Sequence, residues 1–178
     1  MIKTKRQNSE VLYASDQIIK VDEQDIVLLK QQASANQRKR IRLCTHRNVA
    51  DNLHEMLIIH SKNSYVAPHK HPGKTISYHI IEGLADVVIF AENGDILDVI
   101  HMGEYRSGLK FYHRIFEPYY YMPVVHSDFL VFQETTQGPF HPSDTIYAPW
   151  APSEENQDAG RKFLEQLKLK IDNKLSTQ

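Results

Sequence analysis

The sequence predicts a mainly β domain built as an antiparallel barrel or sandwich. Short runs rich in β-branched and aromatic residues recur at nearly regular spacing between residues 53 and 132, a pattern that favours such folds over a parallel sheet. Glu92-Asn93-Gly94-Asp95 separates two apolar runs, and Asn-Gly is the strongest local hairpin signal. The 178 residues, 41% of them hydrophobic, suit one domain with a sizeable core.

The first forty residues are expected to form an arm that contains a strand and a helix. Short apolar runs at Val11–Tyr13 and Ile18–Ile19 indicate one or two strands. The pattern of residues 21–33 indicates a helix with Asp22 as its N-cap. Isolated edge strands are rarely stable. The arm is therefore expected to dock on a sheet or on a partner subunit, and we expect a homodimer.

Three arginines follow the predicted helix, in the run Arg38-Lys-Arg40-Ile-Arg42. One interpretation is a solvated helix end that leads into a strand. The other is a contact for a phosphate or carboxylate ligand, because the planar guanidinium suits both groups.

The barrel itself is expected over residues 41–152. Its strands are predicted at 52–60, 65–71, 75–81, 84–90, 96–100, 110–116, 119–122 and 124–132. Residues 138–152 are rich in Pro, Ser, Asp and aromatic residues, which indicates a covering loop. A last helix is expected over 153–178, with Ser153 as N-cap and an apolar face.

Bulk composition excludes several classes of function. The net charge is −1, from 21 basic and 22 acidic residues. The chain therefore has no net positive charge that would attract nucleic acid. Cys44 is the single cysteine, which excludes intrachain disulfides and multi-cysteine metal sites. The sequence shows neither a signal-peptide pattern nor an apolar run of membrane-spanning length. A cytoplasmic protein with a small-molecule ligand is expected.

A hairpin around residues 66–83 carries the strongest functional pattern. His69 and His71 are two residues apart, so on a strand their side chains share one face. Pro72-Gly73 follows with turn chemistry, and an apolar strand then leads to Glu82-Gly83. Two imidazoles on one face can meet one metal ion, and the pattern therefore predicts a metal site.

This stretch resembles the first motif of the cupin superfamily. Met122-Pro123-Val-Val-His126 resembles the second motif, which implies His126 as a third ligand. Residues 132–140 and 144–154, with Gly-Pro-Phe and Ala-Pro-Trp-Ala-Pro, resemble the closing segment of the WbuC-type cupin fold metalloproteins. The resemblance implies a cupin-type barrel, of the jelly-roll or double-stranded β-helix kind, with a role near O-antigen or lipopolysaccharide metabolism. Three neutral imidazoles suit Zn, Fe, Ni or Cu.

The chain departs from the superfamily pattern at Ile76, where the resemblance implies a glutamate ligand. Isoleucine cannot bind a metal, so the protein ligands would be neutral and the ion more weakly held. Tyr78 shares the face of Ile76 and is a candidate catalytic residue, or simply part of the barrel wall. Glu134 is a second candidate, as a general base or as an acceptor for a ligand histidine, or an ordinary strand-end charge.

Three functional hypotheses follow. The first is a metal-binding cupin that acts on a sugar or sugar nucleotide, by polarising a carbonyl or activating water, with isomerisation or epimerisation of a keto-sugar among the candidate reactions. The second is a carbohydrate-binding or sensing module with a structural metal. The third is a three-histidine iron dioxygenase. The residues alone do not force catalysis, because no nucleophile triad and no phosphate-binding glycine loop is present.

Overall fold

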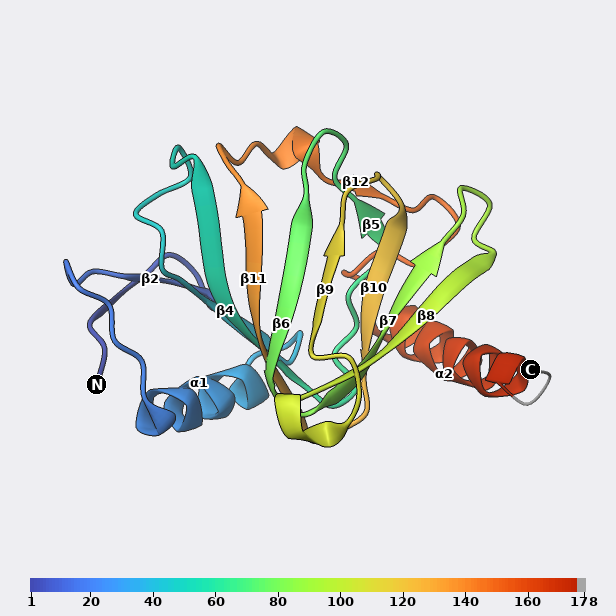
Figure 1. The fold of residues 1–178 in the computed structure, drawn as a ribbon, viewed down its shortest axis with the longest axis horizontal. Helices are drawn as coiled ribbons and strands as arrows, with labels where there is room; N and C mark the ends of the chain where they lie inside the picture. The colour runs from blue at the N-terminus through green and yellow to red at the C-terminus, as the bar shows by residue number, and fades with distance from the viewer. Residues whose placement is uncertain (176–178) are drawn as a thin grey trace.

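Two β-sheets face each other, and one helix packs outside each of them (Figure 1). The computed structural model describes residues 1–175, so the end of the predicted helix at 176–178 lies outside the described residues. The larger sheet has the order β1-β2-β3-β4-β11-β6-β9 and the smaller one the order β12-β5-β10-β7-β8. The predicted mainly β fold, with helices near the two ends, is confirmed.

The bounds of the elements are as follows. The larger sheet contains β1 (Thr4–Arg6), β2 (Val11–Ala14), β3 (Arg40–Cys44), β4 (Leu53–Ser61), β6 (Ile76–Glu82), β9 (Tyr112–Ile115) and β11 (Phe129–Gln137). The smaller sheet contains β5 (His69–Lys70), β7 (Leu84–Phe90), β8 (Ile96–Gly103), β10 (Tyr120–Val125) and β12 (Ile146–Tyr147). The helices are α1 (Glu23–Ala35) and α2 (Gln157–Leu175), with single 3-10 turns at Tyr105–Ser107 and Pro142–Asp144.

Strand alternation divides the buried side chains into an interior and two outer layers. The interior between the sheets holds side chains such as Met56, Tyr78 and Tyr121. α1 covers the outer face of the larger sheet through Leu29 and Ala33, which pack on β3, β4 and β11. α2 covers the outer face of the smaller sheet through an apolar stripe made of Leu164, Leu167 and Ile171. Inward-facing polar residues are therefore enclosed from both sides.

The N-terminal arm joins the larger sheet of its own chain. β2 pairs with β3 in parallel, at Leu12 opposite Leu43, whereas the other strand pairs of the two sheets are antiparallel. Asp22 caps α1 as predicted, in a reciprocal capping box with Asp25. Asp25 also accepts a hydrogen bond from the backbone N–H of Ile2 at 2.8 Å. Of the two expected docking places, the sheet is the one seen.

The predicted start of the last helix needs correction. α2 begins at Gln157, and the side chain of Asn156 accepts from the N–H of Ala159 at 3.1 Å, which is N-cap geometry. Ser153 is thus not the cap. Residues 153–156 instead form a turn that leaves Glu154 directed toward β3, where it binds two arginines.

The predicted hairpin at residues 84–100 is present as β7 and β8. Gly94 has φ +89°, and a Cβ there would lie 2.9 Å from Cδ2 of Trp150. Trp150 covers the turn and donates from Nε1 to the carbonyl of Glu92 at 3.0 Å. The closing segment is therefore tied to this hairpin. Neither helix of the described chain combines the length and apolarity needed to cross a bilayer.

Candidate functional site

A cavity of about 380 Å³ lies in the barrel interior. Its walls are inward-facing side chains of β2, β3, β4, β6 and β11, and the segments that carry His69 and Tyr147 close it on the other side. Two of the three predicted histidines, His69 and His71, line this one cavity, as do Ile76 and both candidate catalytic residues. The volume falls in the range of roughly 300–1,000 Å³ typical of small-ligand pockets.

His69 and His71 lie side by side, with ring centroids 5.1 Å apart. Nδ1 of His69 lies 2.8 Å from the carbonyl oxygen of Ala67, and Nδ1 of His71 lies 3.2 Å from that of Asp144. A carbonyl only accepts, so both Nδ1 atoms carry the proton and both Nε2 atoms keep a lone pair. Burial lowers the pKa of His69, and burial lowers that of His71 to about 4. Both rings are therefore neutral bases at neutral pH.

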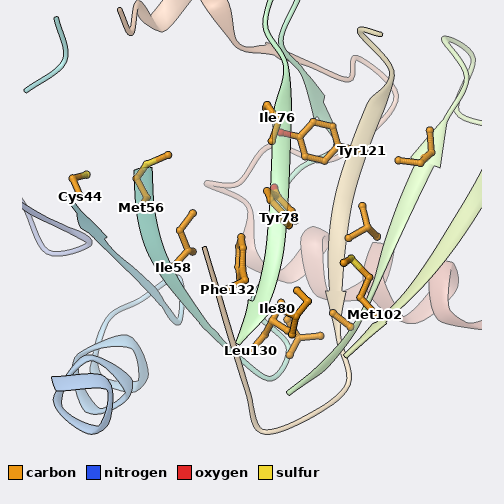
Figure 2. Close-up of a cluster of buried hydrophobic side chains, with 14 residues drawn as sticks. Cys44, Met56, Ile58, Ile76, Tyr78, Ile80, Met102, Tyr121, Leu130 and Phe132 are labelled. Carbon is orange, nitrogen blue, oxygen red and sulfur yellow. The ribbon is translucent and has the colours of Figure 1, made fainter. Parts of the chain in front are cut away.

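Tyr121 occupies the place beside His69 on the neighbouring strand. The two residues are cross-strand partners, and their ring centroids are 4.8 Å apart. Figure 2 shows the Tyr121 side chain reaching from β10 across the interior toward Ile76 and Tyr78 on β6. Its side chain is almost fully buried, and burial raises the pKa of Tyr121 well above its ordinary value.

Glu134 and Tyr78 lie opposite each other on β11 and β6. The Tyr78 hydroxyl and the Glu134 carboxyl group lie close enough to affect each other's pKa. Burial raises the pKa of Glu134, and the Arg42 charge and the neighbouring Tyr78 act in the opposite direction. A carboxyl group with a raised pKa in an enclosed cavity is suited to proton transfer.

The structure brings His126 to neither His69 nor His71. The inward parity of β10 belongs to Tyr121, Pro123 and Val125, so His126 falls on the outer side. There its Nε2 donates to Asp86 Oδ2 at 2.8 Å, while His101 Nδ1 donates to Oδ1 at 2.6 Å. Burial alone would raise the pKa of Asp86, but these two hydrogen bonds hold it below the ordinary value. His126 as a third ligand stays a prediction, and in this structure it lies with Asp86, apart from the other two histidines.

The remaining donors do not complete a metal centre of three protein ligands. Over residues 1–175, no group of three His, Cys, Asp or Glu side chains has an arrangement that could hold a metal ion. Ile76 faces the cavity at the place where a fourth ligand was expected, and it is buried. Two imidazoles with free Nε2 atoms have suitable donor chemistry but lack a partner. Metal binding by this chain stays a prediction.

Four charged side chains close the side of the cavity next to the arm. Arg38 donates to Glu10 at 2.6 Å and to Glu154 at 2.7 Å, and Arg40 donates to Glu154 at 3.0 Å and to Glu10 at 3.3 Å. Glu154 also accepts from the N–H of Ala67 at 3.2 Å, two residues before His69. These contacts hold together the closing segment, the arm and the segment that leads into His69.

Sequence reasoning singled out neither Tyr121, which lies in the barrel interior, nor His54 and His60, which line the cavity. Both histidines are buried, and their Nε2 and Nδ1 atoms, respectively, have no hydrogen-bond partner within the described chain. Strand parity was the available signal, because His54, Met56, Ile58 and His60 alternate along β4 toward the interior.

Comparison with known proteins gives a match without a described function. Residues 21–102 match a family model described as a domain of unknown function, DUF6016. This match covers α1 through most of β8, and so includes His69, His71 and Tyr78 but not Tyr121 or Glu134. No curated protein matches the chain.

Solved structures resemble the fold at low sequence identity. A Shewanella oneidensis protein has a TM-score of 0.50 and 9% identity, over 60% of this chain and 72% of that one. The capsular polysaccharide assembling protein CapF of Staphylococcus aureus has a TM-score of 0.45 and 18% identity, over 55% and 27%. Oxalate decarboxylase of Bacillus subtilis has a TM-score of 0.45 and 17% identity, over 56% and 24%. The match thus spans about a quarter of the last two chains, and at these identities the likeness concerns the fold alone.

Proposed function

We propose that this chain is a small-molecule-binding cupin-type barrel that transfers protons on a polar ligand in its interior. The observation that carries the proposal is the pairing of basic and acidic groups around one cavity: the His69 and His71 imidazoles lie on one wall, and the Glu134 and Tyr78 pair lies on another. A sugar or sugar nucleotide in surface-polysaccharide metabolism is the proposed ligand class. That part rests on the resemblance of residues 132–154 to WbuC-type proteins.

This arrangement suits movement of a proton on a carbon next to a carbonyl group. A neutral imidazole with a free Nε2 can remove such a proton, and a tyrosine hydroxyl can donate a hydrogen bond to the carbonyl oxygen where negative charge develops. Glu134 lies opposite Tyr78 on β11, and its raised pKa suits it to return the proton to the ligand. Return of the proton to another carbon isomerises the ligand, and return to the opposite face epimerises it.

Deuterium exchange tests the proposal directly. A UDP-linked 4-keto sugar incubated with the protein in D₂O should gain deuterium beside the carbonyl, followed by proton NMR. Glu134→Gln and Tyr78→Phe should slow the exchange by about 100-fold or more, the usual range for an acid–base group. Tyr112→Phe, which changes an exposed tyrosine on β9, is the matched control and should leave the rate unchanged.

Two results would decide against proton transfer. Saturable binding of the sugar nucleotide with no exchange would leave a binding or sensing module, the second hypothesis. Exchange that is unchanged in the Glu134 and Tyr78 variants would place the chemistry elsewhere. The three-histidine dioxygenase has no support from the geometry, because His126 lies apart from the other two histidines.

A further inference from the structure

Most ionic side chains that line the cavity are already paired within the protein. Arg40 binds Glu10 and Glu154, as described above. Lys74 binds Asp144 with Nζ and Oδ2 2.7 Å apart. Two of the three Lys and Arg side chains that line the cavity are thus in ion pairs, and so are three of its four carboxylates.

Arg42 and Glu134 are the charged residues left over among the described lining residues. Neither takes part in an ion pair within 4.0 Å over residues 1–175, and the Arg42 guanidinium has no hydrogen-bond partner there. Arg42 faces the cavity because it shares strand parity with Arg40 and Cys44 on β3. The positive charge of Arg42 acts to lower the pKa values of both His69 and Glu134.

We propose that Arg42 binds the acidic group of the ligand, and that the ligand is a small hydroxylated organic anion, namely a sugar phosphate or a sugar acid. The inference rests on the proposed small-molecule function of the cavity, but not on proton transfer. The guanidinium fork matches the oxygens of a phosphate or a carboxylate. Glu134 lies on the inner face of the same sheet, with β4 between its strand and that of Arg42, and it can accept a hydrogen bond from a ligand hydroxyl.

The position of Arg42 explains why it, rather than Arg38 or Arg40, is available. Arg40 is the first residue of β3 and Arg38 precedes the strand. Both form several hydrogen bonds with Glu10 and Glu154. Arg42 lies two residues further on, opposite Ile58 on β4, where the adjacent wall is apolar. Arg42 is an exposed residue that lines the cavity, so its guanidinium is open to an anionic ligand.

Isothermal titration calorimetry with three probes tests the assignment: glucose 1-phosphate, glucuronate and glucose. The parent protein should bind at least one anionic probe and bind glucose much more weakly. Arg42→Gln should weaken that binding by about 10- to 100-fold, the range for one charge-assisted contact. Arg42→Lys should show an intermediate loss because it keeps the charge but not the fork. The phosphate and carboxylate probes tell the two acids apart.

A control variant separates the role of Arg42 from general effects. Arg114→Gln removes an exposed arginine on β9 that lies against Phe116, and it should not change binding. Thermal melting of this variant and of the parent establishes that it is folded.

The proposal is overturned if Arg42→Gln binds the anionic probes as the parent does, if glucose binds equally well, or if neither anionic probe binds at millimolar concentration. Loss of anion binding in Arg114→Gln to the same extent would also overturn it, by showing a bulk-charge effect. The deuterium-exchange assay reports separately on proton transfer. If Arg42→Gln exchanged deuterium at the rate of the parent, this inference would be wrong while the proposed proton transfer would still hold.

Discussion

Several buried histidines place polar ring nitrogens in the largely apolar interior of the barrel. His60 is an example: it lies on β4 with its ring edge against Phe132 at 5.4 Å, and Nδ1 has no partner among the described residues. Burial lowers the pKa of His60 to about 3. His113 is also buried, and burial lowers its pKa to about 4. The folded protein therefore keeps these rings neutral, at a free-energy cost that depends on pH.

Stability should fall as the solution is acidified through the range of these histidines. The folded pKa of His60 lies below the unfolded value of 6.5, so below that pH the unfolded chain takes up a proton that the folded chain does not. The contribution of His60 is complete above pH 6.5 and is lost as pH falls toward 3. His60→Phe should reduce the pH slope of the free energy of unfolding by up to about 1.4 kcal/mol per pH unit.

Urea unfolding across this pH range measures the slope. His79→Gln is the matched control, because His79 lies on the exposed face of β6 and its loss should leave the slope unchanged. An equal slope in the parent and in His60→Phe would mean that His60 is protonated in the folded state.

At the scale of elements, strand parity decides what each side chain can reach. β10 directs Tyr121 into the barrel interior beside His69 and leaves His126 on the outer side with Asp86. β3 likewise sends Arg40 and Arg42 inward, while Ile41 and Leu43 pack toward α1. A shift of one residue in either strand would exchange the two sets. Strand register therefore determines which residues line the cavity, and a sequence motif alone does not.

The β7–β8 hairpin offers a test of how the closing segment contributes to stability. Gly94→Ala puts a Cβ into the ring of Trp150 and strains a backbone at φ +89°, so the free energy of unfolding should fall by about 1–3 kcal/mol. Gly108→Ala is the matched control, with φ +78° and no atom within 4 Å of the new Cβ. Urea unfolding should show the larger loss for Gly94→Ala, and equal losses would mean that Trp150 moves aside without cost.

β6 offers a test of the predicted metal site. Ile76 faces the cavity, so Ile76→Glu should add an oxygen donor near His69 and His71 and increase zinc retention. Zinc per chain after dialysis against a graded chelator measures this. Ile81→Glu, at the exposed outer parity of the same strand, should have no effect. Equal retention by the two variants would indicate nonspecific binding, and faster loss from Ile76→Glu would rule out a site at this pair.

In the whole molecule, the N-terminal arm extends the larger sheet of its own chain. Leu12 is buried between α1 and the sheet, and Ile2 is tied to Asp25. A barrel that completes its sheet in this way does not need a partner subunit for the arm. The expected homodimer stays a prediction, and its interface has to lie elsewhere if the arm stays in place.

Deletion of residues 1–14 separates the two roles of the arm. The truncated chain loses β1 and β2 and uncovers part of β3, so its melting temperature should fall by several degrees while its oligomeric state stays that of the parent. Sedimentation velocity and thermal melting check the two points. Conversion of a dimer into an equally stable monomer would show that the arm crosses between subunits.

The sequence alone determined the features that local rules govern. Asp22 caps α1, Asn-Gly turns the β7–β8 hairpin, and the two-residue spacing places His69 and His71 on one face, because each depends on neighbours along the chain. Only the tertiary structure decided which distant groups meet. Glu154 ties Arg38 and Arg40, so that Arg42 is the arginine left to face the cavity, and Tyr121 rather than His126 lies beside His69. Those contacts join segments as much as 116 residues apart, and pairing at that separation depends on sheet register, which no local pattern specifies.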